Sequence, residues 1–437
     1  MKIVQLTPGT GNFYCGTCLR DNALVTALRA QGHDAVLLPM YLPHFVDEES
    51  SVAQDAPIFF GGINVYLQQK SALFRAAPRW LGRLLDSPAL LRLAARRAGM
   101  TSASDLGELT HSMLLGEQGR QALELEKAVA WLSQPANRPD VVGLSNALLL
   151  GLARRIKETL RVPVVCTLQG EDTFLDALPE PERCWSALRE RAGDADRYVA
   201  VSRSYGETMR RRMGLPPERV EVVPNGINLD GYAPAAGGLP RPPVIGFLAR
   251  MHPTKGLGTL VEAFLLLKKR GGLPGLRLRV AGMQTEEDAL YVGRLKERLH
   301  AAGYGSHAEF LPNLARAEKQ AFLRTLSVLS VPAAYDEAFG LYVLEALASG
   351  VPVVQPARGA FPELIEATGG GILCPPDDPR ALADALETAL ADPERLAALG
   401  RCGREAVAER FTSAVMARGY ALVCQSAREA GGHAGGA

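Results

Sequence analysis

The chain has 437 residues, of which 47% are hydrophobic and 22% are charged. This length exceeds what one compact core usually holds, so we expect two domains. The 48 Lys and Arg residues stand against 47 Asp and Glu residues, which leaves a formal charge of +1. A chain so nearly neutral has no general attraction to nucleic acid or to a membrane, so we expect no nucleic-acid partner.

Compartment and redox state follow from the N-terminus and from the cysteines. Residues 1–6 run straight into a strand pattern without a long apolar stretch, which predicts a cytoplasmic protein. The seven cysteines are scattered and odd in number, which favours reduced thiols over a disulfide framework. Cys15 and Cys18 are the one close pair, and further ligands at zinc spacing are not visible. We expect no metal site.

Short apolar runs rich in β-branched residues alternate with helical patterns along the whole chain. In the first half, buried parallel strands are expected at residues 3–6, 35–38, 141–144, 162–168 and 197–201. In the second half, strands are expected at residues 244–248, 276–281, 309–311, 328–331 and 351–354. The alternation predicts an α/β fold of two doubly wound, Rossmann-like domains.

A Pro- and Gly-rich stretch at residues 233–243 separates the two series and is interpreted as the linker. We place the N-terminal domain at residues 1–232 and the C-terminal domain at residues 242–411. Ligands of such sheets bind at the carboxyl ends of the strands, so the site is expected in a cleft between the domains.

Two further segments are expected to be helical. Strand signals disappear over about residues 71–134, which predicts a helical insertion in the first domain. Residues 64–100 carry seven basic side chains and one acidic one, which describes either a solvated helix face or a contact with an anionic acceptor or membrane.

Near the C-terminus, residues 379–409 look helical. A further helix at about 412–428 is expected to pack back on the first domain, followed by an unstructured tail at 431–437.

The most specific pattern places two glutamates around the start of a helix. Glu337 lies in the loop after strand 328–331, Gly340 opens the next helix, and Glu345 lies one turn or more into it. The first amides of a helix are unpaired donors at the positive end of the macrodipole, which favours a diphosphate there. Glu345 can accept hydrogen bonds from a ribose diol, and Glu337 can reach a sugar.

The spacing Glu-x7-Glu, followed by residues 346–354, resembles the donor motif of glycosyltransferase family four, whose fold is GT-B. Residues 223–228, 246–256 and 359–363 occur in the order that this family shows. The resemblance implies a retaining enzyme that moves a sugar from a nucleoside diphosphate sugar to a hydroxyl of a glycan, lipid or small molecule.

The resemblance also assigns the donor residues. It implies that Arg250 and Lys255 neutralise the diphosphate of the donor, whose negative charge grows as the glycosidic bond breaks. We add to the donor site the residues at the helix start and two glycines, namely Phe339, Gly340, Leu341, Gly282 and Gly16. Gly16 is carried over from a double glycine of the family that this chain replaces with Cys15-Gly16.

The first domain departs from the family at a second position. Gln169 stands where the family usually has a histidine, and we include it in the catalytic set as a hydrogen-bonding residue that cannot titrate near neutral pH. Glu171 and Asp172 follow it and either contact the acceptor or lie in a solvated loop. In a G-x-G-x-x-G frame that starts at Gly9, Tyr14 stands at the position of the last glycine. This departure from the dinucleotide-binding motif disfavours an NAD enzyme.

The expected mechanism needs no metal and no cofactor besides the sugar nucleotide. Arg250, Lys255 and the amides at the helix start already supply positive charge and hydrogen bonds to the phosphates. The departing phosphate can deprotonate the incoming hydroxyl on the same face of the sugar. The alternatives are a nucleotide-sugar-binding protein without activity, and a sugar-nucleotide epimerase or phosphorylase of the same fold. An anionic or membrane-attached acceptor remains an alternative, and with it a peripheral position of the protein at the inner face of the membrane. The donor base and sugar and the oligomeric state also remain open.

Overall fold

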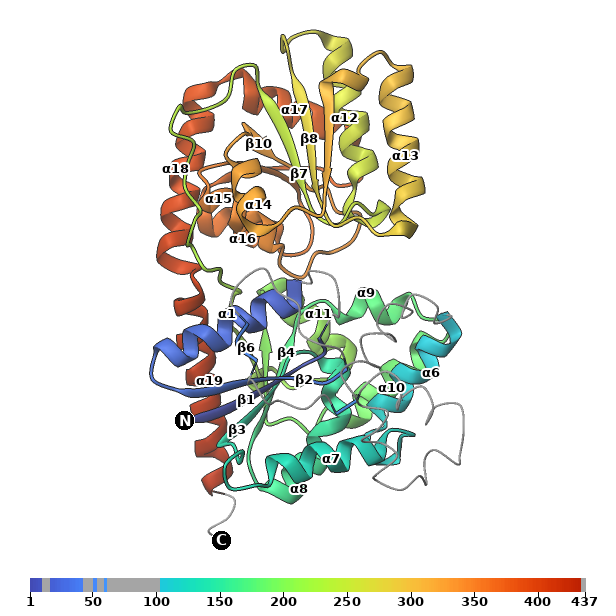
Figure 1. Cartoon of the computed structure of the whole chain (residues 1–437), viewed down its shortest axis with the longest axis vertical. Helices are drawn as coiled ribbons and strands as arrows, with labels where there is room; N and C mark the ends of the chain where they lie inside the picture. The colour runs from blue at the N-terminus through green and yellow to red at the C-terminus, as the bar shows by residue number, and fades with distance from the viewer. Residues whose placement is uncertain (10–15, 42–49, 53–58, 61–102, 434–437) are drawn as a thin grey trace. The chain divides into compact units, whose positions relative to one another are not determined.

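The structure is a computed structural model that describes residues 1–9, 16–41, 50–52, 59–60 and 103–433. The chain divides into two compact units, unit 1 with Met1–Pro224 and Ser413–Ala437, and unit 2 with Asn225–Thr412. Each unit is built on a six-stranded sheet in which every pair of neighbours is parallel (Figure 1). The predicted α/β class with two doubly wound sheets is confirmed.

The sheet of unit 1 has the order β2-β1-β3-β4-β5-β6. Its strands are β1 (Lys2–Thr7), β2 (Asp34–Pro39), β3 (Val141–Leu144), β4 (Val164–Leu168), β5 (Arg197–Ala200) and β6 (Val220–Val222). The central strands β3 and β4 are buried along their whole length, which explains why they read as continuous apolar runs. The edge strand β6 was not predicted, because its three residues are too short and too exposed to give such a run.

Helices surround this sheet. They are α1 (Gly16–Ala30), α6 (Ala103–Leu114), α7 (Ala122–Leu132), α8 (Ala153–Leu160), α9 (Glu171–Asp176), α10 (Pro181–Arg191), α11 (Arg203–Met213) and α19 (Ser413–His433), with short turns η2 (Gly116–Gln118), η3 (Ala147–Leu152) and η4 (Pro217–Arg219). Figure 1 shows α19, in red, running beside α1. Leu24 and Leu28 of α1 share one hydrophobic cluster with Met416 and Val423 of α19.

The C-terminal helix returns to unit 1, where Tyr420 Oη donates a hydrogen bond to Gln5 Oε1 of β1 at 2.9 Å. It extends to His433, past the predicted end at residue 428, so the expected unstructured tail at 431–437 begins too early. Within the predicted insertion, residues 103–134 contain α6, η2 and α7. Residues 71–102, with most of the basic side chains, lie outside the described residues, as does Cys15.

The sheet of unit 2 has the order β12-β11-β10-β7-β8-β9. Its strands are β7 (Val244–Leu248), β8 (Arg277–Gly282), β9 (Ala308–Pro312), β10 (Val328–Leu329), β11 (Val353–Pro356) and β12 (Gly371–Cys374). β7, the first strand of the unit in sequence, lies in the middle of the sheet. The chain adds β8 and β9 on one side of it and β10, β11 and β12 on the other, so the direction of winding reverses between β7 and β10. Ligands of open α/β sheets bind outside the carboxyl ends of the strands at such a switch point.

The helices of unit 2 are α12 (Leu257–Arg270), α13 (Glu286–Ala301), α14 (Arg316–Leu323), α15 (Leu341–Ala348), α16 (Phe361–Thr368), α17 (Pro379–Ala391) and α18 (Pro393–Arg410), with turns η5 (Pro253–Lys255) and η6 (Gly305–His307). Residues 379–409, expected as one helical segment, form two helices. Asp392 ends α17 and caps α18 by accepting from the Arg395 amide at 3.0 Å, and Pro393 opens α18. Proline tolerates only the first helical turn, which fixes the break.

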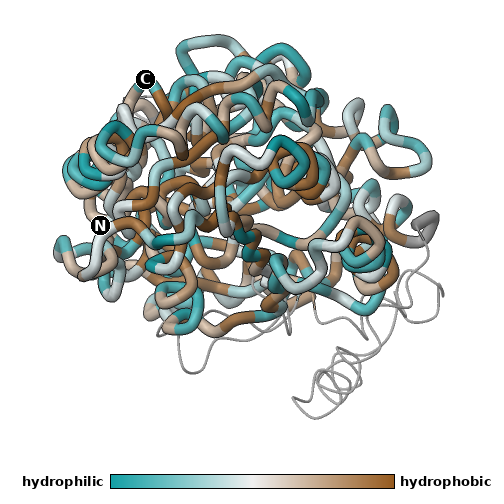
Figure 2. The backbone as a smooth tube through the Cα atoms, turned by 90° about the horizontal axis from the view of Figure 1, so that it is seen from above, coloured by the Kyte–Doolittle hydropathy of each residue, from teal (hydrophilic) through white to brown (hydrophobic). Residues whose placement is uncertain are grey.

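Figure 2 colours the backbone by hydropathy. Hydrophobic stretches, in brown, are frequent on the inner segments, and hydrophilic stretches, in teal, are frequent on the outer turns. No helix in the described part of the chain combines the length and apolar character needed to cross a membrane. The six cysteines among the described residues are free thiols, as their scattered spacing predicts.

Candidate active site

Two segments of unit 2 leave the sheet at its switch point. One connects the end of β7 to α12 through η5, and the other connects the end of β10 to α15. β7 and β10 are parallel neighbours, with Ile245 opposite Val328 and Gly246 opposite Leu329. Because parallel neighbours end at the same edge, residues 249–256 and 330–340 meet there. These segments carry most of the predicted donor residues of this unit.

A lysine and a glutamate join the two segments. Lys255 Nζ donates to Glu337 Oε2 at 2.6 Å, and the two side chains are only 20% and 12% exposed. Tyr335 Oη and Tyr342 Oη donate to the same carboxylate oxygen at 3.1 Å and 2.9 Å. The Lys255 ammonium also lies 4.9 Å and 5.7 Å from the centroids of these two rings. Glu337 is therefore held through Oε2, which leaves Oε1 for a ligand.

This cluster shifts the pKa values of its members. Burial alone would lower the pKa of Lys255, but the Glu337 carboxylate raises it above its ordinary value, so Lys255 remains a cation. Burial, reinforced by the Glu337 charge, raises the pKa of Tyr335 to about 12. Burial also raises the pKa of Tyr342 well above its ordinary value. Both tyrosines therefore remain neutral donors at physiological pH.

The loop that carries Glu337 is packed against residues 359–360. The Ala360 amide donates to the Glu337 carbonyl at 2.9 Å. Gly359 has a φ of +54°, and a Cβ atom there would lie 2.5 Å from the Glu337 amide nitrogen and 2.6 Å from its carbonyl oxygen. Only glycine allows this approach, so Gly359 sets the position of the Glu337 backbone.

Replacing Gly359 with alanine is expected to lower the free energy of unfolding by about 1–3 kcal/mol, because the clash involves backbone atoms that must move. Gly369→Ala is the matched control: Gly369 has a φ of +59°, and the nearest atom to an added Cβ is 3.8 Å away. Urea denaturation of both variants measures the difference. Equal losses of stability in the two variants would show that the contact with Glu337 is unimportant.

The predicted glycines at the helix start and at the end of β8 are also constrained by packing. Gly340, with a φ of +89°, caps α15, and a Cβ there would lie 3.1 Å from Phe361 and 3.6 Å from Glu337. A Cβ at Gly282 would lie 1.8 Å from the Ala249 carbonyl oxygen, next to Arg250. Both glycines therefore have a steric role in shaping the site, whatever they bind.

Arg250 lies in the segment after β7 and is oriented by α13. Its Nε and Nη2 donate to the two oxygens of Asp288 at 3.0 Å and 3.3 Å. Although burial opposes it, this guanidinium holds the pKa of Asp288 below its ordinary value. The Arg250 side chain remains 39% exposed, so it can also contact a ligand.

The second glutamate of the motif lies on α15 and has its own partners. Tyr232 Oη and Lys319 Nζ each approach Glu345 Oε1 at 2.7 Å. The Phe339 side chain, by contrast, is 4% exposed, and its ring lies 6.4 Å from that of Phe411. Any donor contact of Phe339 would therefore involve its backbone. Leu341 is the first residue of α15, and its side chain is only partly buried.

The predicted residues of unit 1 lie at the carboxyl ends of its strands. Gln169 follows β4, and its Nε2 donates to the Ser145 carbonyl oxygen after β3 at 2.5 Å. Ser145 Oγ in turn donates to Asp21, which pairs with Arg20 at 2.9 Å; both charged side chains are fully buried. The Gln169 amide is thus held at the end of a buried polar chain. Gly16 is exposed at the start of α1.

Glu171 and Asp172 do not lie in a solvated loop. Glu171 is 4% exposed and accepts from the amides of Ala147, Gln169 and Gly170 at 2.7–2.9 Å. Tyr205 Oη lies within hydrogen-bond distance of both carboxylates, at 2.8 Å and 3.0 Å. Burial raises the pKa of Glu171 and of Asp172. Glu171 therefore anchors the loops after β3 and β4.

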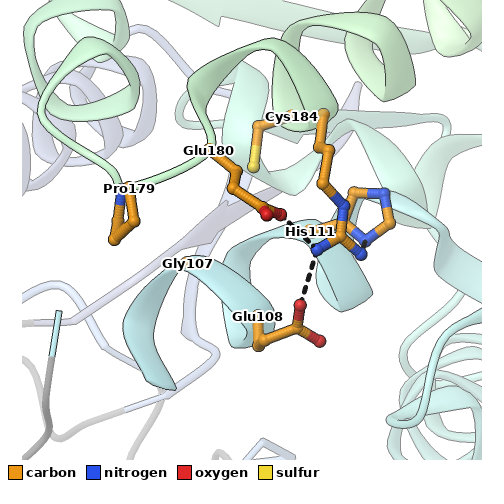
Figure 3. Close-up of a pocket in the computed structure, with 7 residues that line it drawn as sticks. Gly107, Glu108, His111, Pro179, Glu180 and Cys184 are labelled. Atoms are coloured by element: carbon orange, nitrogen blue, oxygen red, sulfur yellow. Dashed lines mark hydrogen bonds and ion pairs between the residues drawn. The ribbon is translucent and has the colours of Figure 1, made fainter. Parts of the chain in front are cut away.

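A separate hollow of ≈ 150 Å³ lies between α6 and α10 of unit 1 (Figure 3). Its charged groups satisfy one another, because Arg183 Nη1 donates to Glu108 at 2.7 Å and to Glu180 at 2.6 Å. Arg183 Nη2 donates to His111 Nδ1 at 3.4 Å, and burial followed by the Arg183 charge lowers the pKa of His111. None of the residues predicted from the sequence lines this hollow.

Among the residues that the structure describes, no group of three or more His, Cys, Asp or Glu side chains is arranged to hold a metal ion.

Two solved structures illustrate the fold that this chain shares with known proteins. Sucrose-phosphate synthase from Thermosynechococcus elongatus has a TM-score of 0.71 at 20% identity and covers 98% of this chain and 100% of its own. Anabaena HepE in complex with UDP-glucose has a TM-score of 0.65 at 19% identity, with the same coverage of the two chains. At this identity the likeness shows the fold, which is GT-B.

Sequence comparisons identify the family. The model of Glycosyl transferases group 1 matches residues 234–406, and that of Glycosyltransferase Family 4 matches residues 112–230, together about two thirds of the chain. Residues 234–406 therefore form a domain of the Glycosyl transferases group 1 family, and residues 112–230 are similar to Glycosyltransferase Family 4.

Two curated relatives share a name. D-inositol 3-phosphate glycosyltransferase of Streptomyces bingchenggensis is 32% identical over 273 residues, which are 58% of this chain and 59% of the relative. The protein of the same name from Rhodococcus opacus is 30% identical over 229 residues, 51% of each chain. The match thus spans between half and three fifths of the length of these relatives.

Proposed function

We propose that this protein is a retaining glycosyltransferase that moves a sugar from a nucleoside diphosphate sugar to a hydroxyl acceptor. The observation that carries the proposal is the Lys255–Glu337 pair at the switch point of unit 2, where the two segments leaving β7 and β10 meet. In this proposal the Lys255 cation binds the phosphates of the donor, and the neighbouring Glu337 carboxylate binds its sugar.

Each part of the donor has a matching group. Lys255 and Arg250 supply positive charge for the diphosphate, and the start of α15 supplies backbone amides. Glu337 offers Oε1 to a sugar hydroxyl while its other oxygen is held by three donors. Glu345, inside α15, is the acceptor for the ribose. The relative crystallised with UDP-glucose favours a uridine nucleotide as the donor.

The chemistry follows from these contacts. A bond forms between the acceptor oxygen and the anomeric carbon, the bond from that carbon to the β-phosphate oxygen breaks, and the acceptor proton passes to the departing phosphate. The cations stabilise the charge that builds up on this phosphate. Gln169 cannot take the proton, because an amide does not titrate in this range. This route, with attack on the face that the phosphate leaves, gives retention without a metal or a further cofactor.

The acceptor is proposed from the named relatives. Their name denotes a glycosyltransferase acting on an inositol phosphate, so an anionic polyol is the first acceptor to examine. This choice fits the basic residues 64–100 of the sequence, seven positive against one negative.

The test incubates the purified full chain with UDP-, GDP- and ADP-sugars, with and without inositol phosphates, and follows release of nucleoside diphosphate. We expect transfer from one donor class, an unchanged anomeric configuration by NMR, and full activity in the presence of EDTA. Tight binding of a sugar nucleotide with neither transfer nor hydrolysis over the whole panel would favour a binding protein instead. An epimer or a sugar phosphate as product would indicate the other two alternatives.

A further inference from the structure

Glu345 is held by an asymmetric set of contacts. Tyr232 Oη and Lys319 Nζ both lie 2.7 Å from Oε1 of this carboxylate. Among the residues that the structure describes, no side chain or backbone group is seen to donate to Oε2. The side chains of Lys319 and Glu345 are 13% and 15% exposed, so the carboxylate is shielded but open to a ligand.

Tyr232 belongs to a segment that α14 holds in place. Arg316 Nη2 donates to the carbonyl oxygens of Asn228 and Asp230 at 3.3 Å and 3.2 Å. Gln320 Nε2 donates to the Asp230 carbonyl at 2.7 Å, and Arg324 Nη1 donates to that of Gly231 at 3.2 Å. Residues 228–231 are therefore fixed by side chains from one helix.

The Tyr232 ring itself is fixed in the same way. It is 7% exposed, and the Arg316 guanidinium lies 5.3 Å from its centroid. Lys319 comes from the same helix, α14. Both contacts to Oε1 thus originate in one assembly of α14 with the preceding segment, which defines the rotation of the Glu345 carboxylate.

An orientation fixed through one oxygen has a consequence for ligand binding. A freely rotating carboxylate can turn either oxygen to a hydroxyl group. The Glu345 carboxylate can offer Oε2, but turning Oε1 to the ligand would break the hydrogen bond from Tyr232 and the ion pair with Lys319. Hydrogen bonds that involve charged groups contribute about 1.5–3 kcal/mol each. Keeping the carboxylate oriented before binding also reduces the entropic cost of forming the new contact.

We propose that Tyr232 and Lys319 are positioning residues that hold Glu345 with Oε2 available to one ribose hydroxyl, and that they thereby set a preference for ribonucleotides over deoxyribonucleotides. This inference rests on the proposed function, because it takes the ligand of unit 2 to be a nucleoside diphosphate. Tyr232 and Lys319 act through Glu345 and need not touch the nucleotide.

The test is the affinity of the full chain for UDP and for its 2′-deoxy and 3′-deoxy forms, measured by isothermal titration calorimetry. We expect one deoxy form to bind about tenfold or more weakly than UDP, as the loss of a hydrogen bond to a charged acceptor predicts. In Tyr232→Phe and Lys319→Met this ratio should fall several-fold, mainly because UDP binds less tightly. Lys319→Arg, which restores a cationic donor, should recover part of the ratio.

Matched controls lie in the same unit. Tyr304→Phe removes the hydroxyl of a tyrosine whose ring stacks on His307. Lys296→Met removes the ammonium of an exposed lysine that lies over the ring of Phe310. Neither change should alter the ratio.

Two results would overturn the inference while leaving the proposed function intact. One is an unchanged ratio in both Tyr232→Phe and Lys319→Met. The other is an equal loss of affinity for UDP and its deoxy forms, which would indicate that the two residues only stabilise α14 and α15. Absence of binding to UDP, GDP and ADP by the wild type would overturn the inference and the donor site together.

Discussion

Glu337→Gln is expected to lower the rate of sugar transfer by about 10²-fold or more, the usual effect of removing one contact made to the reacting group in the transition state. The amide can still accept from Lys255 through one oxygen, but an NH₂ group then replaces Oε1, which is the acceptor left for the sugar. The affinity for the free nucleoside diphosphate should stay the same or increase. Lys255 would no longer be neutralised by a carboxylate at 2.6 Å.

Initial rates at saturating donor and calorimetric titration with nucleoside diphosphate measure the two effects separately. Glu262→Gln is the control, since Glu262 forms an ion pair with Arg298 at 2.7 Å on the surface of the same unit. Transfer at the wild-type rate in Glu337→Gln would exclude Glu337 from the reaction. A parallel loss of nucleotide affinity would mean that this glutamate supports the fold of the site rather than the sugar.

Lys255→Met, unlike Glu337→Gln, is expected to lower the affinity for the nucleoside diphosphate. It removes a charged donor to phosphate, worth about 1.5–3 kcal/mol, and should weaken binding of the nucleoside diphosphate about 10- to 100-fold. Methionine keeps the apolar stem between Tyr335 and Tyr342, whose rings lie 4.9 Å and 5.7 Å from the ammonium. Glu337 keeps both tyrosine donors, so the loop should retain its position.

Calorimetric titration of Lys255→Met against wild type measures the loss, with Lys296→Met as the control for removal of a surface charge. Arginine is not expected to rescue the variant fully, because its planar fork of donors differs in shape and hydrogen-bond geometry from the compact ammonium. Unchanged nucleotide affinity in Lys255→Met would assign the phosphates to another cation.

The fold could be predicted from the sequence because its strands are buried on both faces. Such strands read as continuous apolar runs, and the alternation with helical patterns implies parallel sheets. The strands that were missed, β6 and β12, are edge strands of three and four residues with partly exposed side chains. Their pairing depends on the neighbouring strand, which a local pattern does not record.

The residues of the candidate site could be predicted only where they stand in motifs of the family, as Lys255, Glu337 and Glu345 do. Glu337 and Glu345 lie close together in sequence around a helix start, and the Glu-x7-Glu motif therefore predicted both residues. Their partners come from elsewhere: Lys319 lies 26 positions before Glu345, and Tyr232 lies 113 positions before it. Tyr335 and Tyr342 stand inside the motif, but a tyrosine beside a glutamate has no signal that distinguishes a hydrogen-bond donor from a core residue.

Glu171 shows what the sequence could not decide. Its polar neighbours in the run Gln-Gly-Glu-Asp left open an acceptor contact or a solvated loop, whereas in the structure Glu171 is buried and accepts hydrogen bonds from backbone amides after β3 and β4. Buried carboxylates that accept several amide hydrogen bonds cannot be recognised without the backbone around them.

The return of α19 to unit 1 affects the order in which the protein can fold during synthesis. Unit 2 is one continuous stretch, Asn225–Thr412, whereas unit 1 needs both its first 224 residues and the helix that begins at Ser413. Until that helix leaves the ribosome, Leu24 and Leu28 on α1 lack part of their hydrophobic cover. The domain that is translated first is therefore the one whose core is completed last, after the second domain already has all of its own residues.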